Sequence, residues 1–134
     1  MVNIGNPGSG QRGTMEELMK AMGADIGMFK GTTELTSSQQ VKALCDGKID
    51  AFGYSVGFPN GAMEEAATCA AKAMPINLTG GPVQGLIDGA DYYAKAVIPK
   101  GTYTGQKKDV TTFGVKATFV TGANVCEELV YLVT

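Results

Sequence analysis

NIGNPGSGQRGTMEELMKAMG, residues 3–23, is the stretch that decides the fold. Strand-like residues come first, a turn rich in glycine follows, and an amphipathic helix is predicted from about Ser9 or Gln11 to Met22. The first amides of a helix have no intrahelical acceptor, and the helix dipole places partial positive charge there. Helix N-termini therefore bind phosphates and carboxylates. The stretch predicts an anion-binding turn, to which Ser9 supplies a hydroxyl or the helix cap.

The turn also satisfies the dinucleotide pattern G-x-G-x-x-G over residues 8–13, which alone is a weak signal. A Walker A loop is excluded, because Gln11 and Arg12 follow Gly10 where Lys-Ser/Thr is required. A dinucleotide site needs an acidic residue about 20 residues on, at the end of the next strand. Glu34 comes late for this role and Asp25 comes early. A small anion is favoured over a dinucleotide, and a purely structural turn is the remaining alternative.

The rest of the chain alternates predicted strands and helices. A strand or a short hairpin is predicted over residues 26–35, and strands over residues 49–54, 73–78, 93–98 and 110–121. Helices are predicted over residues 37–46 and 62–72, after Gly81 and from about Val125. Capping signals support three of the helices: a box that starts at Thr36 or Ser37, Asn60, and a box formed by Asn124 and Glu127. The alternation predicts an α/β domain with a mostly parallel sheet flanked by helices.

A second candidate loop, YSVGFPN at residues 54–60, also lies between a predicted strand and a predicted helix. It therefore belongs to the same sheet edge as the first turn, where open α/β sheets bind ligands. Two such loops side by side form half of a cleft. The alternative is an ordinary loop with Phe58 packed in the core, and the sequence supports both equally.

Composition excludes several classes of site. The chain has no histidine, which removes Ser-His-Asp and Cys-His catalysis and histidine-containing zinc sites. Net charge is −2 with scattered basic residues, which gives no footprint for nucleic acid. Cys45, Cys69 and Cys126 are far apart without a C-x-x-C motif, so three buried hydrophobic cysteines are predicted. No apolar run approaches the roughly 20 residues that span a bilayer.

Several motifs point to one family. They are GNPGSGQR (5–12), GKIDAF (47–52), GFPNGA (57–62), IPKGTY (98–103), TFGVKAT (112–118) and ELVY (128–131). Together they resemble the TAXI family of TRAP-transporter solute-binding proteins. Members of that family are bilobed periplasmic proteins that deliver a small organic anion to a membrane permease driven by an ion gradient.

The resemblance implies one lobe of a periplasmic-binding-protein-like fold. Residues 1–109 correspond to ligand-binding lobe two, and residues 110–134 to a hinge strand and the start of the return into lobe one. Both ends of the chain look like cuts, so we expect lobe one and a signal peptide to belong to a longer, periplasmic protein.

The residue pattern and the resemblance agree on a ligand site. The predicted ligand-binding residues are Asn6, Gly8, Ser9, Gly10, Gln11, Tyr54, Val56, Gly57, Phe58 and Asn60. By resemblance, residues 8–10 hold a carboxylate through backbone amides and a hydroxyl, and residues 54–60 line the same cleft. Arg12 is an alternative contact, or else it pairs with surface acids.

The expected function is capture of a small carboxylate or amino acid for a TRAP-type transporter, without enzymatic activity, metal or cofactor. The expected partners are the small organic anion, the permease subunits and lobe one, with no nucleic acid. Two alternatives stay open: a Rossmann-like nucleotide-binding enzyme domain, and a structural remnant that binds nothing.

Overall fold

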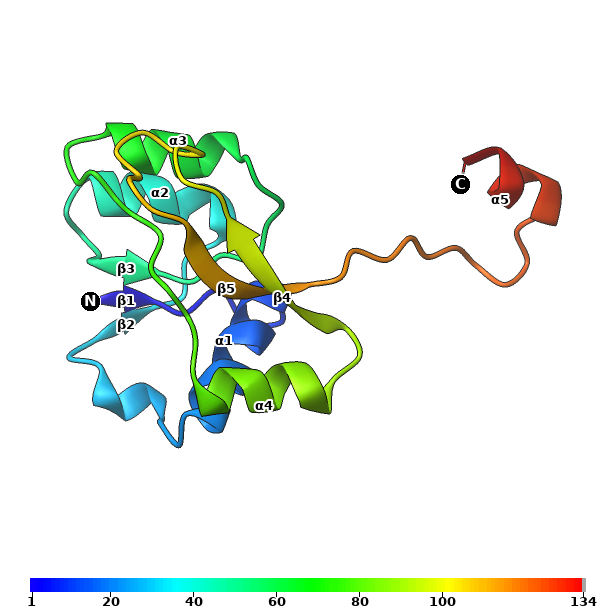
Figure 1. Ribbon diagram of the computed structural model, residues 1–134, viewed down its shortest axis with the longest axis horizontal. Coiled ribbons are helices and arrows are strands. Elements are labelled where there is room, and N and C mark those ends of the chain that lie inside the picture. Colours follow the sequence, from blue (N-terminus) through cyan, green and yellow to red (C-terminus); the bar gives the residue numbers. More distant parts are fainter. Residues whose placement is uncertain (134) are drawn as a thin grey trace.

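The computed structural model describes residues 1–133 and divides them into two parts (Figure 1). Residues 1–116, here called the body, pack together. Residues 117–133, here called the arm, extend away from the body and end in a short helix. The last residue of the predicted 110–134 segment lies outside the described residues.

The body contains a parallel three-stranded sheet in the order β2-β1-β3. Its strands are β1 (Val2–Asn3), β2 (Thr32–Thr33) and β3 (Ala51–Phe52). Val2 pairs with Thr32 on one side and with Ala51 on the other. Because the strands are parallel, the glycine-rich turn after β1 and the loop after β3 leave the sheet at the same edge. The predicted α/β class is confirmed.

Helices cover the sheet in two pairs (Figure 1). They are α1 (Gly10–Ala21), α2 (Ser37–Cys45), α3 (Gly61–Thr68) and α4 (Gly81–Gly89), of which α2 packs on α3 and α1 on α4. The core under α2 and α3 is built from small and branched side chains: Val41, Ala43, Leu44, Ile49 and Ala66. The predicted box at Thr36 is confirmed, since its backbone N–H donates to the Gln39 side chain at 3.1 Å.

A hairpin joins the body beside this sheet. Strand β4 (Tyr93–Ile98) pairs antiparallel with β5 (Val110–Val115). Tyr93 is buried, packs edge-on against Phe113 with ring centroids 5.2 Å apart, and donates its hydroxyl proton to Glu17 of α1 at 2.5 Å. The hairpin is therefore anchored to α1, although it pairs in the opposite sense to the parallel sheet.

Several predicted strands are shorter than expected, and one is wrong. Residues 73–78 form no strand; they contact β5 where the Leu78 N–H donates to the Thr111 carbonyl at 2.9 Å. Residues 26–28 form a 3-10 turn, because the Asp25 carboxylate accepts the Gly27 N–H at 2.6 Å and closes the chain locally. The predicted strand over residues 49–54 is reduced to β3.

Two predicted helix ends are also wrong. Helix α3 stops at Thr68 instead of continuing to residue 72, since Thr68 bonds back to the Glu64 and Glu65 carbonyls and Cys69 is extended. Helix α5 (Glu127–Val133) begins after Cys126, whose carbonyl accepts its first backbone bonds. Asn124 therefore does not cap it.

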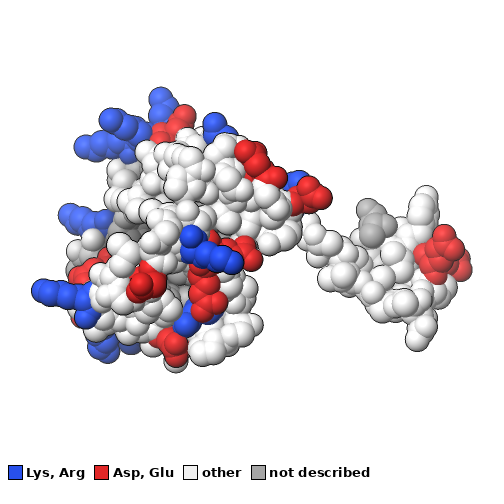
Figure 2. Space-filling view, turned by 90° about the horizontal axis from the view of Figure 1, so that it is seen from below, with Lys and Arg blue, Asp and Glu red and all other residues white. Residues whose placement is uncertain are grey.

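The arm has little packing of its own. The predicted strand over residues 110–121 ends at Val115, and the chain then runs to α5 without regular structure. The segment from Ala117 to Cys126 carries no charge, and Figure 2 shows it as a white connection between the body and an acidic tip. Val120 is 83% exposed and Leu132 is 75% exposed. Within residues 1–133, no helix has the length and apolarity needed to cross a membrane.

Candidate ligand-binding site

The turn from β1 into α1 depends on two glycines. Gly5 and Gly8 have φ values of +87° and +77°, a left-handed conformation that side chains other than glycine disfavour. At Gly5 a Cβ atom would also lie 3.0 Å from the Arg12 backbone nitrogen. Around Gly8 and Gly10 there is open space instead. The turn is thus closely packed against α1 at Gly5 and has open space at Gly8 and Gly10.

Ser9 is the N-cap of α1. Its hydroxyl donates to the Asn6 carbonyl at 2.7 Å and accepts the Arg12 N–H at 3.2 Å. The hydroxyl proton is therefore used within the turn. The N–H groups of Gly10 and Gln11 lie in the first helical turn, where amides have no intrahelical acceptor. These two N–H groups are the backbone donors that the turn leaves at the start of α1.

The Arg12 guanidinium is held by two surface carboxylates and by the Gly5 carbonyl. Its guanidinium contacts Glu16 at 2.5 Å and Glu34 at 2.8 Å. The hydrogen bonds to Glu34 and then Glu16 raise the pKa of Arg12 above its ordinary value. The prediction that Arg12 pairs with surface acids is confirmed. The same contact occupies Glu34, the late candidate for binding a ribose.

A chain of hydrogen-bonded side-chain amides, which the sequence did not predict, holds the Gln11 side chain. Asn3 and Gln40 are fully buried, and the Asn3 Nδ2 donates to the Gln40 Oε1 at 3.0 Å. The same oxygen accepts the Gln11 Nε2 at 2.7 Å. Gln40 lies four residues before Leu44 on the buried face of α2, which is the signal that could have identified it. Strand β1 and helix α2 together fix the Gln11 side chain.

The second loop places most of its side chains outside the core. Phe58 is 45% exposed and Val56 is 41% exposed, so the alternative with Phe58 packed in the core is wrong. Asn60 caps α3 as predicted: its Oδ1 accepts the N–H groups of Ala62 at 3.0 Å and Met63 at 3.3 Å.

A cavity of about 730 Å³ lies between this loop, α1 and the hairpin. Five predicted site residues line it: Gln11, Tyr54, Val56, Gly57 and Phe58. Asn6, Gly8, Ser9 and Gly10 form the adjoining turn rather than the cavity wall. The structure therefore joins Gln11 to the second loop across one cavity.

Asn60 lines a different, more open pocket of about 640 Å³, formed with residues 101–107. Two contacts hold that segment against α3. The Glu64 carboxylate accepts the Thr104 N–H at 3.0 Å and also the Thr104 hydroxyl, which lowers the pKa of Glu64. Tyr103 is buried between the two pockets, and burial raises the pKa of its phenol. Sequence reasoning did not place this segment at the site.

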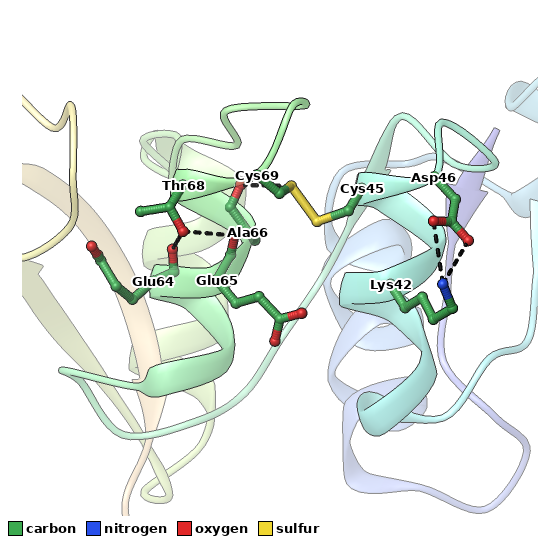
Figure 3. The surroundings of a disulfide bond; sticks show 8 residues. All are labelled: Lys42, Cys45, Asp46, Glu64, Glu65, Ala66, Thr68 and Cys69. Atoms are coloured by element: carbon green, nitrogen blue, oxygen red, sulfur yellow. Dashed lines mark hydrogen bonds and ion pairs between the residues drawn. A yellow bond between two sulfur atoms is a disulfide. The ribbon is translucent and has the colours of Figure 1, made fainter.

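A disulfide closes the part of the chain that carries the second loop (Figure 3). Cys45 ends α2, Cys69 follows α3, and their sulfurs are bonded across 24 residues. The expectation of three buried hydrophobic cysteines is wrong, since two are paired and Cys126 is exposed on the arm. Sequence spacing could not show this pairing, because packing of α2 on α3 brings the two cysteines together. Disulfides of this kind persist in oxidising compartments.

Within residues 1–133, no group of three or more His, Cys, Asp or Glu side chains is placed to hold a metal ion. On the face in Figure 2, basic and acidic side chains are interspersed over the body. The candidate site therefore consists of a cavity, the backbone N–H groups of Gly10 and Gln11, and the Gln11 carboxamide.

These features define an α/β body with a cavity beside the carboxyl edge of its parallel sheet, the edge at which open α/β sheets bind ligands. The NMT1-like family model matches residues 1–134, and the chain belongs to this family. It is a periplasmic-binding-protein-like family related to the TAXI and NMT1 solute-binding proteins, and its members are typically not enzymes.

Proposed function

We propose that this chain is the ligand-gripping lobe of an extracytoplasmic solute-binding protein that captures a small carboxylate or amino acid for a TRAP-type transporter. The observation that carries the proposal is the cavity shared by Gln11 and residues 54–58, next to the open amides of α1. Membership of a periplasmic-binding-protein-like family supports it. The Cys45–Cys69 disulfide is consistent with a periplasmic location.

In this proposal the amides of Gly10 and Gln11 bind the ligand carboxylate. Charge–dipole attraction at a helix N-terminus favours the anion, and the open space at Gly8 leaves room for it. Gln11 and the second loop contact the rest of the ligand. Binding is reversible, as the delivery of a ligand to a permease requires.

The proposal also divides the chain between two lobes, at a boundary that leaves strand β5 of the body on the hinge side. Residues 1–109 act as lobe two, and residues 110–134 lead through the hinge into lobe one of the same protein. The exposed apolar side chains of the arm, Phe119 and Val120 among them, then pack against that lobe. The permease subunits are the remaining partner.

The test removes one backbone N–H from the turn at a position that tolerates proline. Gly10 is the first residue of α1, where proline is well tolerated, and Ser9 before it is already extended with φ −84° and ψ 151°. Gly10→Pro deletes the N–H, whereas the matched control Gly10→Ala keeps it. Amide NMR of the full chain follows titration with short monocarboxylates, dicarboxylates and amino acids at millimolar concentration.

We expect the ligand to shift the amides of residues 8–11, and Gly10→Pro to weaken that binding about tenfold, as loss of a charge-assisted hydrogen bond does. Gly10→Ala keeps the wild-type affinity. Equal affinities in both variants would remove the Gly10 amide from the site. A response to NAD in place of carboxylates would favour the nucleotide-binding alternative.

A further inference from the structure

The cavity wall is predominantly apolar, and much of that apolar surface is uncovered. Aliphatic and aromatic side chains from α1, from the second loop and from the hairpin form it, including Met15, Leu18, Phe52 and Phe113. Val56, Phe58, Ile76 and Val115 also line it and are 41%, 45%, 72% and 48% exposed. Apolar surface in a cavity of this kind is stabilised when a ligand removes it from water.

Charged groups are nearly absent from the same wall. Within the described residues, no Asp or Glu lines the cavity, and Lys116 is the one basic residue there. Its ammonium donates to the Asp91 carbonyl at 2.7 Å, at the end of the hairpin. Arg12, the one arginine in the sequence, is bound by Glu16 and Glu34. Away from Lys116, which lies at one end of the wall, a charged group on the ligand body would lose water without gaining an ion pair.

From these two observations we infer that the cavity selects a carboxylate whose body is uncharged and apolar, such as a branched-chain acid, over a dicarboxylate. The inference rests on the proposed function for the carboxylate itself and adds the class of its body. The Gln11 carboxamide, held by Gln40, is one of the neutral polar groups that the wall presents beside this apolar surface. It can bond a neutral polar substituent but supplies no charge.

The experiment compares ligands that differ only in the second charge. Isocaproate is succinate with an isopropyl group in place of one carboxylate, and leucine stands in the same relation to aspartate. Each is titrated into the full chain and followed by amide NMR at residues 8–11 and 54–58. We expect the apolar member of each pair to bind about tenfold more tightly or better, in the range that apolar pockets achieve.

A second experiment introduces a positive charge into the cavity wall by substitution. Ser55 lines the cavity and is exposed in its loop, so a longer side chain fits without disturbing the core. Ser55→Arg should raise affinity for succinate about threefold to fivefold, as an exposed ion pair does. The matched control Ser55→Gln adds length without charge and should leave the preference for isocaproate unchanged.

The outcomes separate this inference from the proposed function. If succinate binds the wild-type chain as tightly as isocaproate, the inference is overturned while carboxylate capture stands. If isocaproate shifts residues 54–58 and succinate does not, the inference is supported. If neither pair shifts residues 8–11, carboxylate capture itself fails and the inference fails with it.

Discussion

The body and the arm contain similar sequences that adopt different structures. In the body, VTTFGV of β5 pairs with β4 along its whole length. In the arm, ATFVT at residues 117–121 follows directly, has the same β-branched and aromatic character, and forms no strand. Helices α4 and α5 differ in the same way, since α4 packs on α1 while Tyr131 on α5 is 81% exposed.

This comparison separates the two requirements for regular structure. Composition determines which segments are able to form a strand or an amphipathic helix, but a partner surface determines whether their apolar groups are buried. The body provides partners through α2 on α3 and through the hairpin on α1. The arm has the composition without the partner surface, which lobe one would supply under the proposed function.

The largest expected difference in stability between substitutions in the body and in the arm concerns the cysteines. Replacing both Cys45 and Cys69 by serine opens a crosslink with a sequence separation of 24. The unfolded body gains conformational freedom, so the free energy of unfolding should fall by about 3.5 kcal/mol. Urea denaturation followed by circular dichroism measures the change.

Cys126→Ser in the arm is the matched control. It removes an exposed thiol that is not disulfide-bonded, so stability should change by less than about 0.5 kcal/mol. Equal stability of the wild type and the double variant under oxidising conditions would show that the crosslink does not stabilise the body.

A slightly smaller difference is expected for identical leucine truncations. Leu44 is 6% exposed in the core, and Leu44→Ala should cost about 3 kcal/mol through lost burial and the cavity left behind. Leu132→Ala in the arm should cost less than about 0.5 kcal/mol. A comparable cost at both positions, measured by the same denaturation, would mean that the arm packs on the body in solution.

The sequence predicted the body well where the signals are local. The glycine-rich turn, the cap at Ser9, the box at Thr36 and the cap at Asn60 each depend on residues within four positions of one another. The structure confirms all of them. The parallel sheet followed from the alternation of these elements, which is also a property of sequence order.

The parts that sequence reasoning missed depend on contacts between distant segments. The Cys45–Cys69 bond requires α2 to pack on α3, and the Asn3–Gln40–Gln11 chain joins a strand to two helices. Residues 73–78 have a composition suited to a strand, but they meet β5 only near Leu78 and do not pair along their length. Neither periodicity nor capping signals contain this information.

Helix caps give the next comparison between body and arm. Ser9→Ala removes the hydroxyl that accepts the Arg12 N–H, and should cost about 1 kcal/mol of stability. Asn124→Ala, at the predicted but unformed cap of α5, should cost nothing measurable, because α5 starts at Glu127. Thermal unfolding of the two variants decides the matter, and a loss at Asn124 would mean that α5 begins earlier in solution.

The smallest expected effect depends on pH and lies in the contact between α3 and residues 101–107. Thr104 hydrogen bonds lower the pKa of Glu64 from its ordinary value of 4.5. The folded state therefore favours the ionised carboxyl, so the contact stabilises the body above that value and the contribution is lost as pH falls through the lowered pKa. Thr104→Val removes the hydroxyl donor, so it should reduce stability slightly near neutral pH, with the difference from wild type shrinking in acid.

Thr104→Ser keeps the hydroxyl and should behave like the wild type across the same range. Removing the arm beyond Lys116 should leave the acid dependence of both variants unchanged, because the Glu64–Thr104 contact lies wholly in the body. Denaturation midpoints measured from neutral to acid pH test both points. A difference between Thr104→Val and wild type that does not change with pH would mean that the hydroxyl acts through packing rather than through the Glu64 charge.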